Sequence, residues 1–281
     1  MTESGPRTFG NIEDASLPLA VLVHGFPDTP HTWRHLGPEL ARLGYRVVTP
    51  WLPGYETPVG KPVSVGTYAR AILDVRRRYR ADERAVLVGH DWGAIGGYAA
   101  VAFEPEAFGG FVALAVPPTA ALAAGIFSYP QLKRSFYIWF IQQVGLAEGV
   151  VIGPGFFESL WADWSPGYDP TDDIAELRRY VTADNIADVI APYRASFSTS
   201  PEFADPDAEA EAAASMQPPP VPTLYLHGAT DGALGADILA DVETHLPAAG
   251  SVFEIIDGVG HFLHLEQPAL IAAKITDWLL R

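Results

Sequence analysis

The segment Val86-Leu87-Val88-Gly89-His90-Asp91-Trp92-Gly93-Ala94 decides the fold. Its first residues form a short apolar run that predicts a buried strand, and the residues from Trp92 onward predict a helix. Between them lies Gly-x-Asp-x-Gly, the form of a nucleophile elbow, in which small residues flank a strained turn that lifts one side chain above a sheet. Asp91 occupies the nucleophile position. A glycine-rich turn with an aspartate that only caps the helix is the alternative that this segment alone leaves open.

The same alternation of short apolar runs and helical segments extends outward in both directions. It predicts an α/β fold, with a mostly parallel central sheet and helices on both faces. The predicted strands are residues 19–23, 46–49, 85–88, 111–116, 223–226 and 252–256, and the predicted helices are residues 32–43, 67–79, 92–103, 235–245 and 268–280.

The alternation stops at Pro117-Pro118 and resumes only after Pro218-Pro219-Pro220. Proline cannot continue a strand or a helix here, so these runs mark boundaries. We expect residues 1–117 and 218–281 to form the core domain and residues 118–217, here called the insertion, to form a helical cap. Helices are predicted at 131–144 and 174–185, among many aromatic residues, and the acidic, alanine-rich stretch 202–214 predicts an exposed helix or a mobile connector.

Composition narrows the possible functions. The net charge of −16 argues against nucleic acid and against anionic membrane surfaces, because both require a basic face. The chain has no cysteine, no apolar leader and no apolar run long enough to cross a membrane, so we expect a cytoplasmic protein. Nucleotide-binding glycine motifs are absent, and His31 and His35 lack a third ligand nearby in sequence. We therefore expect no cofactor and no metal.

Three further segments place polar groups after predicted strands. In 23–27, Val-His-Gly-Phe-Pro, the amide of Phe26 is expected to join that of Trp92 in an oxyanion hole. Asp231 follows the first strand beyond the insertion, and His261 lies in a glycine-rich loop after the last strand. The order Asp91, Asp231, His261 is the nucleophile, acid, histidine order of hydrolases with this elbow. His261 would be the general base and Asp231 its orienting partner.

Together these motifs resemble those of the epoxide hydrolases of the α/β-hydrolase superfamily, and the likeness spans nearly the whole chain. Epoxide hydrolases use two cap tyrosines to donate hydrogen bonds to the epoxide oxygen. The stretch 135–142, Ser-Phe-Tyr-Ile-Trp-Phe-Ile-Gln, resembles the first tyrosine motif and 192–194, Pro-Tyr-Arg, the second. The resemblance thus implies that Tyr137 and Tyr193 are the electrophilic pair, although each tyrosine could instead serve in packing.

Five other residues are expected to line the substrate pocket: His24, Pro27, Trp51, Trp139 and Phe140. The chain departs from the family near Trp51, because residues 50–55 read Pro-Trp-Leu-Pro-Gly-Tyr where relatives usually carry Asp-x-Arg-Gly. That departure leaves the shape of this loop open.

These observations predict an enzyme that converts a small apolar epoxide and water to a vicinal diol through an alkyl ester on Asp91. The alternatives are a haloalkane dehalogenase with the same nucleophile and a hydrolase-fold protein that binds a ligand without chemistry. Those dehalogenases commonly carry asparagine where Phe26 stands, and a fluoroacetate-type enzyme would carry arginine where Trp92 stands. We expect a monomer or a homodimer.

Overall fold

The computed structural model describes residues 5–56 and 58–281. In this part of the chain, seven strands form one sheet in the order β1-β3-β2-β4-β5-β6-β7, and only β1 runs antiparallel to its neighbour. The predicted α/β-hydrolase fold, with its mostly parallel sheet, is confirmed. Strand β1 was not predicted because three residues are too few to show a periodic pattern. The strands are β1 (Arg7–Phe9), β2 (Leu19–Val23), β3 (Arg46–Thr49), β4 (Val86–His90), β5 (Gly110–Leu114), β6 (Thr223–Gly228) and β7 (Val252–Ile256).

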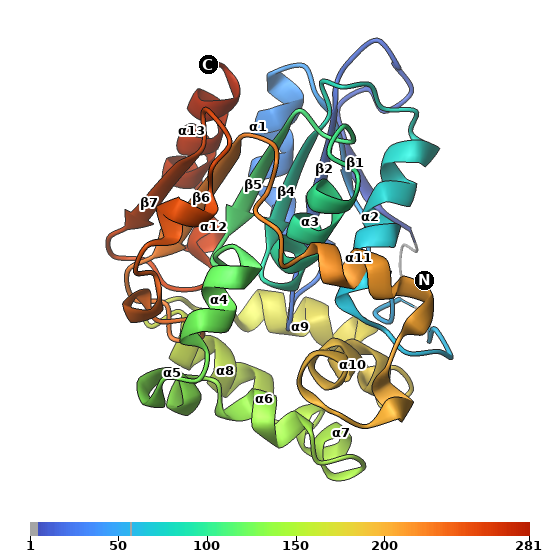
Figure 1. The fold of residues 1–281 in the computed structure, drawn as a ribbon, viewed down its shortest axis with the longest axis vertical. Helices are drawn as coiled ribbons and strands as arrows, with labels where there is room; N and C mark the ends of the chain where they lie inside the picture. Colours follow the sequence, from blue (N-terminus) through green and yellow to red (C-terminus); the bar gives the residue numbers. More distant parts are fainter. Residues whose placement is uncertain (1–4, 57) are drawn as a thin grey trace.

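Helices cover both faces of this sheet (Figure 1). Successive residues of a strand point to opposite faces, so Val21 packs in one apolar cluster and Leu22 in the other. Both clusters are fully buried, which explains the nearly continuous apolar runs in the sequence. One face carries α1 (Leu36–Arg42) and α13 (Pro268–Leu279), and the other carries α2 (Val65–Arg78), α3 (Trp92–Phe103) and α11 (Glu209–Ala214).

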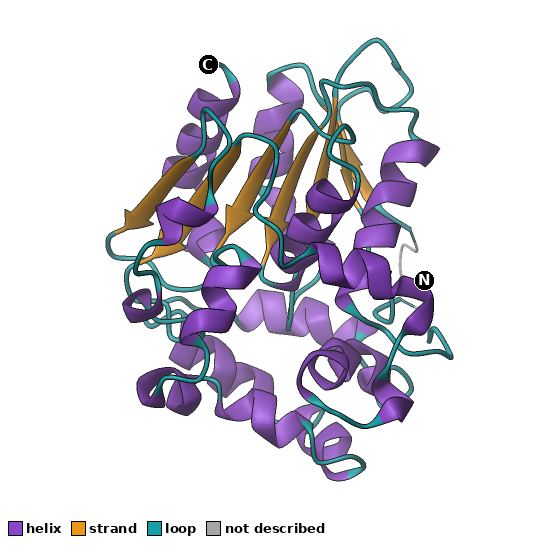
Figure 2. Cartoon of the chain, viewed as in Figure 1, coloured by secondary structure: helices purple, strands orange, loops and turns teal. Residues whose placement is uncertain are grey.

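The chain between β5 and β6 folds into helices that lie beyond the carboxyl ends of the parallel strands (Figure 2). In open α/β sheets, ligands bind at this end of the strands. The helices therefore lie over the expected site. They are α4 (Thr119–Gly125), α5 (Tyr129–Arg134), α6 (Phe136–Ile141), α7 (Leu146–Val151), α8 (Phe156–Trp164), α9 (Thr171–Tyr180) and α10 (Ile186–Phe197).

Some predicted elements differ in the structure. The predicted helix at 235–245 is replaced by two short 3₁₀ helices, because Asp241 adopts a left-handed conformation with φ of 61° between them. The predicted helix at 32–43 begins with a 3₁₀ turn before α1. The 3₁₀ helices are η1 (Pro30–Arg34), η2 (Pro201–Phe203), η3 (Pro206–Ala208), η4 (Ala236–Ile238) and η5 (Val242–His245).

The acidic stretch 202–214 also differs from its prediction. It does form a helix, α11, but this helix packs against α2 and α3. Glu211 is buried there, and its carboxylate accepts a hydrogen bond of 2.6 Å from Nε of Arg70. The chain thus returns to the core before β6 begins. Over the described ranges, no helix combines the length and apolar character that crossing a bilayer requires.

Candidate active site

Asp91 stands in the turn between β4 and α3 with φ of 51° and ψ of −121°. A residue other than glycine with a positive φ has a strained backbone, and such strain is typical of a nucleophile elbow. The turn closes tightly because its neighbours are glycines. A Cβ on Gly93 would lie 2.2 Å from the carbonyl oxygen of Val23, and one on Gly89 would lie 2.4 Å from the carbonyl oxygen of Gly93. The Gly-x-Asp-x-Gly pattern is therefore a steric requirement of this turn.

The carboxylate of Asp91 is buried, and its two oxygens have different neighbours. Oδ1 accepts a hydrogen bond of 2.8 Å from the amide of Phe26, and Oδ2 lies 3.6 Å from Nε2 of His261. Burial opposes ionisation, but the charge of the nearby His261 and the hydrogen bond from the Phe26 amide together lower the pKa of Asp91. Asp91 is therefore an ionised carboxylate at neutral pH.

His261 follows β7, and Asp231 follows β6, the neighbouring strand in the sheet. Nδ1 of His261 donates to Oδ2 of Asp231 at 2.9 Å, while Oδ1 of Asp231 accepts amide hydrogen bonds from Ala233 and Leu234. Burial lowers the pKa of His261, but Asp231 and Asp91 outweigh it and raise the pKa to about 10. Nε2 of His261 has no hydrogen-bond partner among the described residues and faces Asp91, as a base for that site must.

Two tyrosines from the insertion lie in the same site. The rings of Tyr137 in α6 and Tyr193 in α10 meet edge to face with their centroids 5.7 Å apart. Tyr193 also contacts the rings of Phe26 and Trp92, at 5.3 and 4.8 Å, which are the two residues expected to supply the oxyanion hole. Burial raises the pKa of both phenols well above 10, so both remain O–H donors at neutral pH.

Asp91, Tyr137 and Tyr193 all line one cavity of about 420 Å³ between the sheet and the insertion. On the part of the wall that the structure describes, Asp91 is the only charged residue. Much of the remaining wall is apolar, including Ile95, Leu122, Ile126, Phe127, Phe197 and Met216. No sequence pattern indicated that α4 and α11 would contribute to this wall, because their contribution depends on how the insertion returns to the core.

Three of the expected pocket residues in the core lie outside the cavity lining. Nδ1 of His24 donates to the carbonyl of Gly25 at 2.9 Å, and Nε2 accepts from the amide of Leu52 at 3.1 Å. Both nitrogens are thus occupied in supporting loops. The ring of Trp51 packs edge-on against His24, and the carbonyl of Pro27 accepts an indole N–H from the insertion.

The two expected pocket residues of α6 also lie outside the lining. Trp139 packs behind two residues that do line the cavity, Phe127 and Phe197, with ring centroids 5.9 and 5.5 Å away. Phe140 packs against Phe156. Successive residues of a helix are turned by about 100°, so α6 can direct only one of its faces into the cavity. Aromatic content alone did not identify that face.

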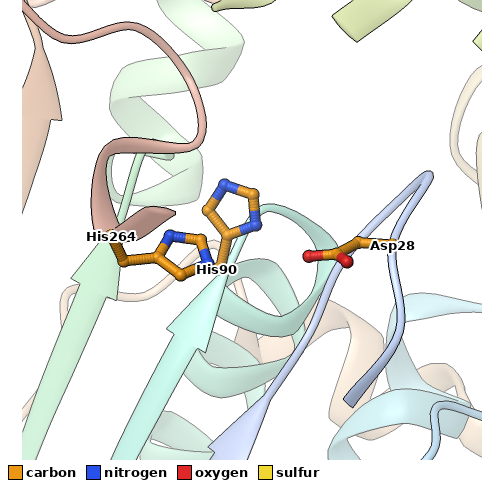
Figure 3. Close-up of side chains that lie close together, drawn as sticks. All are labelled: Asp28, His90 and His264. Atoms are coloured by element: carbon orange, nitrogen blue, oxygen red, sulfur yellow. The ribbon is translucent and has the colours of Figure 1, made fainter. Parts of the chain in front are cut away.

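A second polar cluster is formed by Asp28, His90 and His264 (Figure 3), and His90 directly precedes Asp91 in the chain. Their candidate ligand atoms lie within 4.8 Å of one another, and all three side chains are buried. Burial and the charge of Asp173 raise the pKa of Asp28 to about 8, while burial lowers that of His90 to about 3, so both are neutral at neutral pH. Nε2 of His90 donates to the carbonyl oxygen of His261 at 3.0 Å. The cluster thus ties the nucleophile turn to the histidine loop.

Comparisons with known proteins agree with this architecture. Residues 20–274 match the model of the alpha/beta hydrolase family. The chain is 28% identical to epoxide hydrolase A of Mycobacterium tuberculosis, over 93% of this chain and 90% of that protein. It is 30% identical to fluoroacetate dehalogenase of a Burkholderia species, over 64% of this chain and 62% of that protein.

Among solved structures, the fold resembles that of the Bacillus megaterium epoxide hydrolase in complex with an inhibitor. The TM-score is 0.73 at 19% identity, covering 98% of this chain and 96% of that one. The resemblance to epoxide hydrolases that the motifs indicated is thereby confirmed. With a family model that matches almost its entire length, the chain belongs to the alpha/beta hydrolase family.

Proposed function

We propose that this protein hydrolyses epoxides to vicinal diols through a covalent ester on Asp91. The observation that carries the proposal is the joint position of one ionised carboxylate and two protonated phenols on the wall of a mainly apolar cavity. A carboxylate can open a strained ring by attack at carbon, and the ring oxygen then needs a proton donor. The similarity to named epoxide hydrolases supports the same reaction.

In the first step, Oδ2 of Asp91 attacks a ring carbon, because Oδ1 is held by the amide of Phe26. A bond forms between Oδ2 and that carbon as the ring carbon–oxygen bond breaks. The negative charge that develops on the ring oxygen is stabilised by the O–H groups of Tyr137 and Tyr193, one of which supplies its proton. Among the described residues, the oxygen of Tyr193 has no other hydrogen-bond partner, so it is available to the substrate.

In the second step, Nε2 of His261 takes a proton from water, and the water oxygen attacks the carboxyl carbon of the Asp91 ester. The negative oxygen that forms there is Oδ1, which already accepts from Phe26 and is also expected to accept from the amide of Trp92. Cleavage of the bond between the carboxyl carbon and Oδ2 releases the diol, which carries Oδ2 away as its second hydroxyl oxygen, and the water oxygen takes the place of Oδ2 in the carboxylate. The proton on His261 goes to the departing oxygen, and the proton of the carboxylic acid left on Asp91 restores the phenol that lost its own in the first step.

Dehalogenation is the second candidate, and the similarity to fluoroacetate dehalogenase favours testing it. Two features argue against it. Fluoroacetate is an anion, yet on the described part of the cavity wall there is no lysine or arginine to bind its carboxylate. A halide leaving group also needs no proton, so the two phenols would be unused.

A ligand-binding protein without chemistry would have no need of the paired His261 and Asp231.

The cavity also favours a neutral, apolar substrate. Its apolar wall would bury alkyl or aryl groups, and the carboxylate of Asp91 would repel an anion placed beside it. We therefore expect aryl and alkyl epoxides, with styrene oxide as a suitable test substrate.

The proposal is tested by a parallel panel of styrene oxide, alkyl epoxides, 1,2-dibromoethane and fluoroacetate, with diol and halide measured from the same enzyme preparation. We expect diol formation from the neutral epoxides and little halide release. Halide release from either halogenated compound that exceeds the best epoxide turnover would favour dehalogenation instead.

A further inference from the structure

The loop that carries His261 is held at three consecutive amides by groups from outside it. The amide of Gly260 donates to both carboxylate oxygens of Glu266, at 3.0 and 2.8 Å. The amide of His261 donates to the carbonyl of Trp164 at 2.9 Å, and the amide of Phe262 donates to Oγ of Ser165 at 2.9 Å. The backbone on either side of the catalytic imidazole is therefore fixed in place.

Two of these three acceptors come from one point of the insertion, where α8 ends. The carbonyl of Trp164 also accepts from the amide of Gly232 at 3.2 Å, so one oxygen joins the loops of His261 and Asp231. The approach is very close: a Cβ on Gly232 would lie 1.9 Å from the carbonyl oxygen of Asp163. The insertion thus supports the catalytic pair as well as covering the cavity.

The other two acceptors, Ser165 and Glu266, are hydrogen-bonded to each other. The side chain of Ser165 is fully buried, and its hydroxyl donates to Oε1 of Glu266 at 2.7 Å while accepting from the amide of Phe262. Glu266 in turn accepts from Gly260, so Ser165 and Glu266 form one hydrogen-bonded bridge across the histidine loop. Neither residue lines the cavity, and neither therefore contacts the substrate.

We propose that Ser165 and Glu266 are positioning residues for His261 and act on the second step of the reaction alone. This inference rests on the proposed function, in which His261 removes a proton from water only after the ring has opened. Asp91 and the two tyrosines perform the first step and are held by other contacts. Loss of the bridge therefore slows ester hydrolysis and leaves ring opening nearly unchanged.

The test resolves the two steps in Ser165→Ala and Glu266→Gln enzymes by rapid acid quench with styrene oxide. Intact-protein mass gives the fraction of enzyme that carries the ester, and diol release gives turnover. We expect ester hydrolysis to fall by about 10- to 100-fold in Ser165→Ala, as small displacements of a catalytic group do, with ring opening little changed and ester accumulating. Glu266→Gln keeps one acceptor oxygen and should show a smaller effect of the same kind.

Ser251→Ala is the matched control, because Oγ of Ser251 likewise accepts an amide hydrogen bond, from Thr223 at the start of β6, at 3.1 Å. It should leave both steps unchanged. An unchanged ester-hydrolysis rate in both test variants, or an equal loss in both steps, would overturn the positioning role. If the wild-type enzyme itself forms no ester, the proposed function fails instead, so the two failures are distinguishable.

Discussion

The core loops and the insertion hold their chemical groups in different ways. In the core, Asp91 and His261 are fixed by turns whose backbone hydrogen bonds and glycines permit little movement. In the insertion, Tyr137 and Tyr193 are placed by ring packing, with Tyr193 against Phe26 and Trp92. A local turn is encoded in adjacent residues, whereas ring packing depends on several helices at once. The nucleophile is thus placed by the core, the base by a core loop that the end of α8 holds, and the substrate by the insertion.

The largest expected effect comes from removing the nucleophile of the core. Asp91→Ala should reduce diol formation by at least about 10⁴-fold, as loss of a covalent nucleophile does in hydrolases. Steady-state diol production from styrene oxide measures it, with thermal unfolding as the check on folding. Substantial turnover by a folded Asp91→Ala enzyme would show that the cavity acts without a covalent step.

Removing the phenol groups of the insertion should have a smaller effect. Tyr137→Phe and Tyr193→Phe keep the rings that pack in the site but remove the O–H donors, and each should slow ring opening by about 10²- to 10³-fold. Single-turnover rates of ring opening are the measurement. Tyr168→Phe is the control, because that hydroxyl donates to Asp173 away from the cavity. Equal effects from all three changes would mean that the phenols act only in folding.

The two steps should also differ in their dependence on pH. Ring opening needs ionised Asp91, whose pKa is lowered, and protonated phenols, whose pKa values are raised, so its rate should be flat from about pH 6 to pH 9. Ester hydrolysis needs neutral His261, so its rate should rise with pH. Asp91 carries no charge in the ester, so the midpoint of this rise should lie below the pKa of about 10 that His261 has in the free enzyme. Rapid-quench rates across this range would contradict the assignment if ring opening rose with pH as well.

The smallest effect is expected at an aromatic residue that lies outside the cavity lining. Trp51→Phe should change the KM for styrene oxide by less than about twofold, since Trp51 packs on His24 and Tyr180. Phe127→Ala removes part of the cavity wall and should raise KM more. A larger effect at Trp51 than at Phe127 would show that Trp51 contacts the substrate, as the sequence predicts.

This contrast also explains what could be predicted from the sequence. The sheet and the elbow were predictable because strand periodicity and a glycine-flanked turn are local patterns, and the structure brings Asp91, Asp231 and His261 together at the strand ends. The roles of Tyr137 and Tyr193 were predictable only from the resemblance to a family. The pocket residues Trp139 and Phe140 were misplaced because the face that α6 directs into the cavity depends on its packing. Ser165 and Glu266 were missed because their bridge joins segments about a hundred residues apart.

The most direct test of the mechanism is to trap the ester. A His261→Gln enzyme should still open the ring but should be unable to activate water. After acid quench with styrene oxide, peptide mass mapping should find one epoxide added to the peptide that contains Asp91, in near-stoichiometric amount. Diol formed at the wild-type rate with no added mass on that peptide would contradict the covalent mechanism.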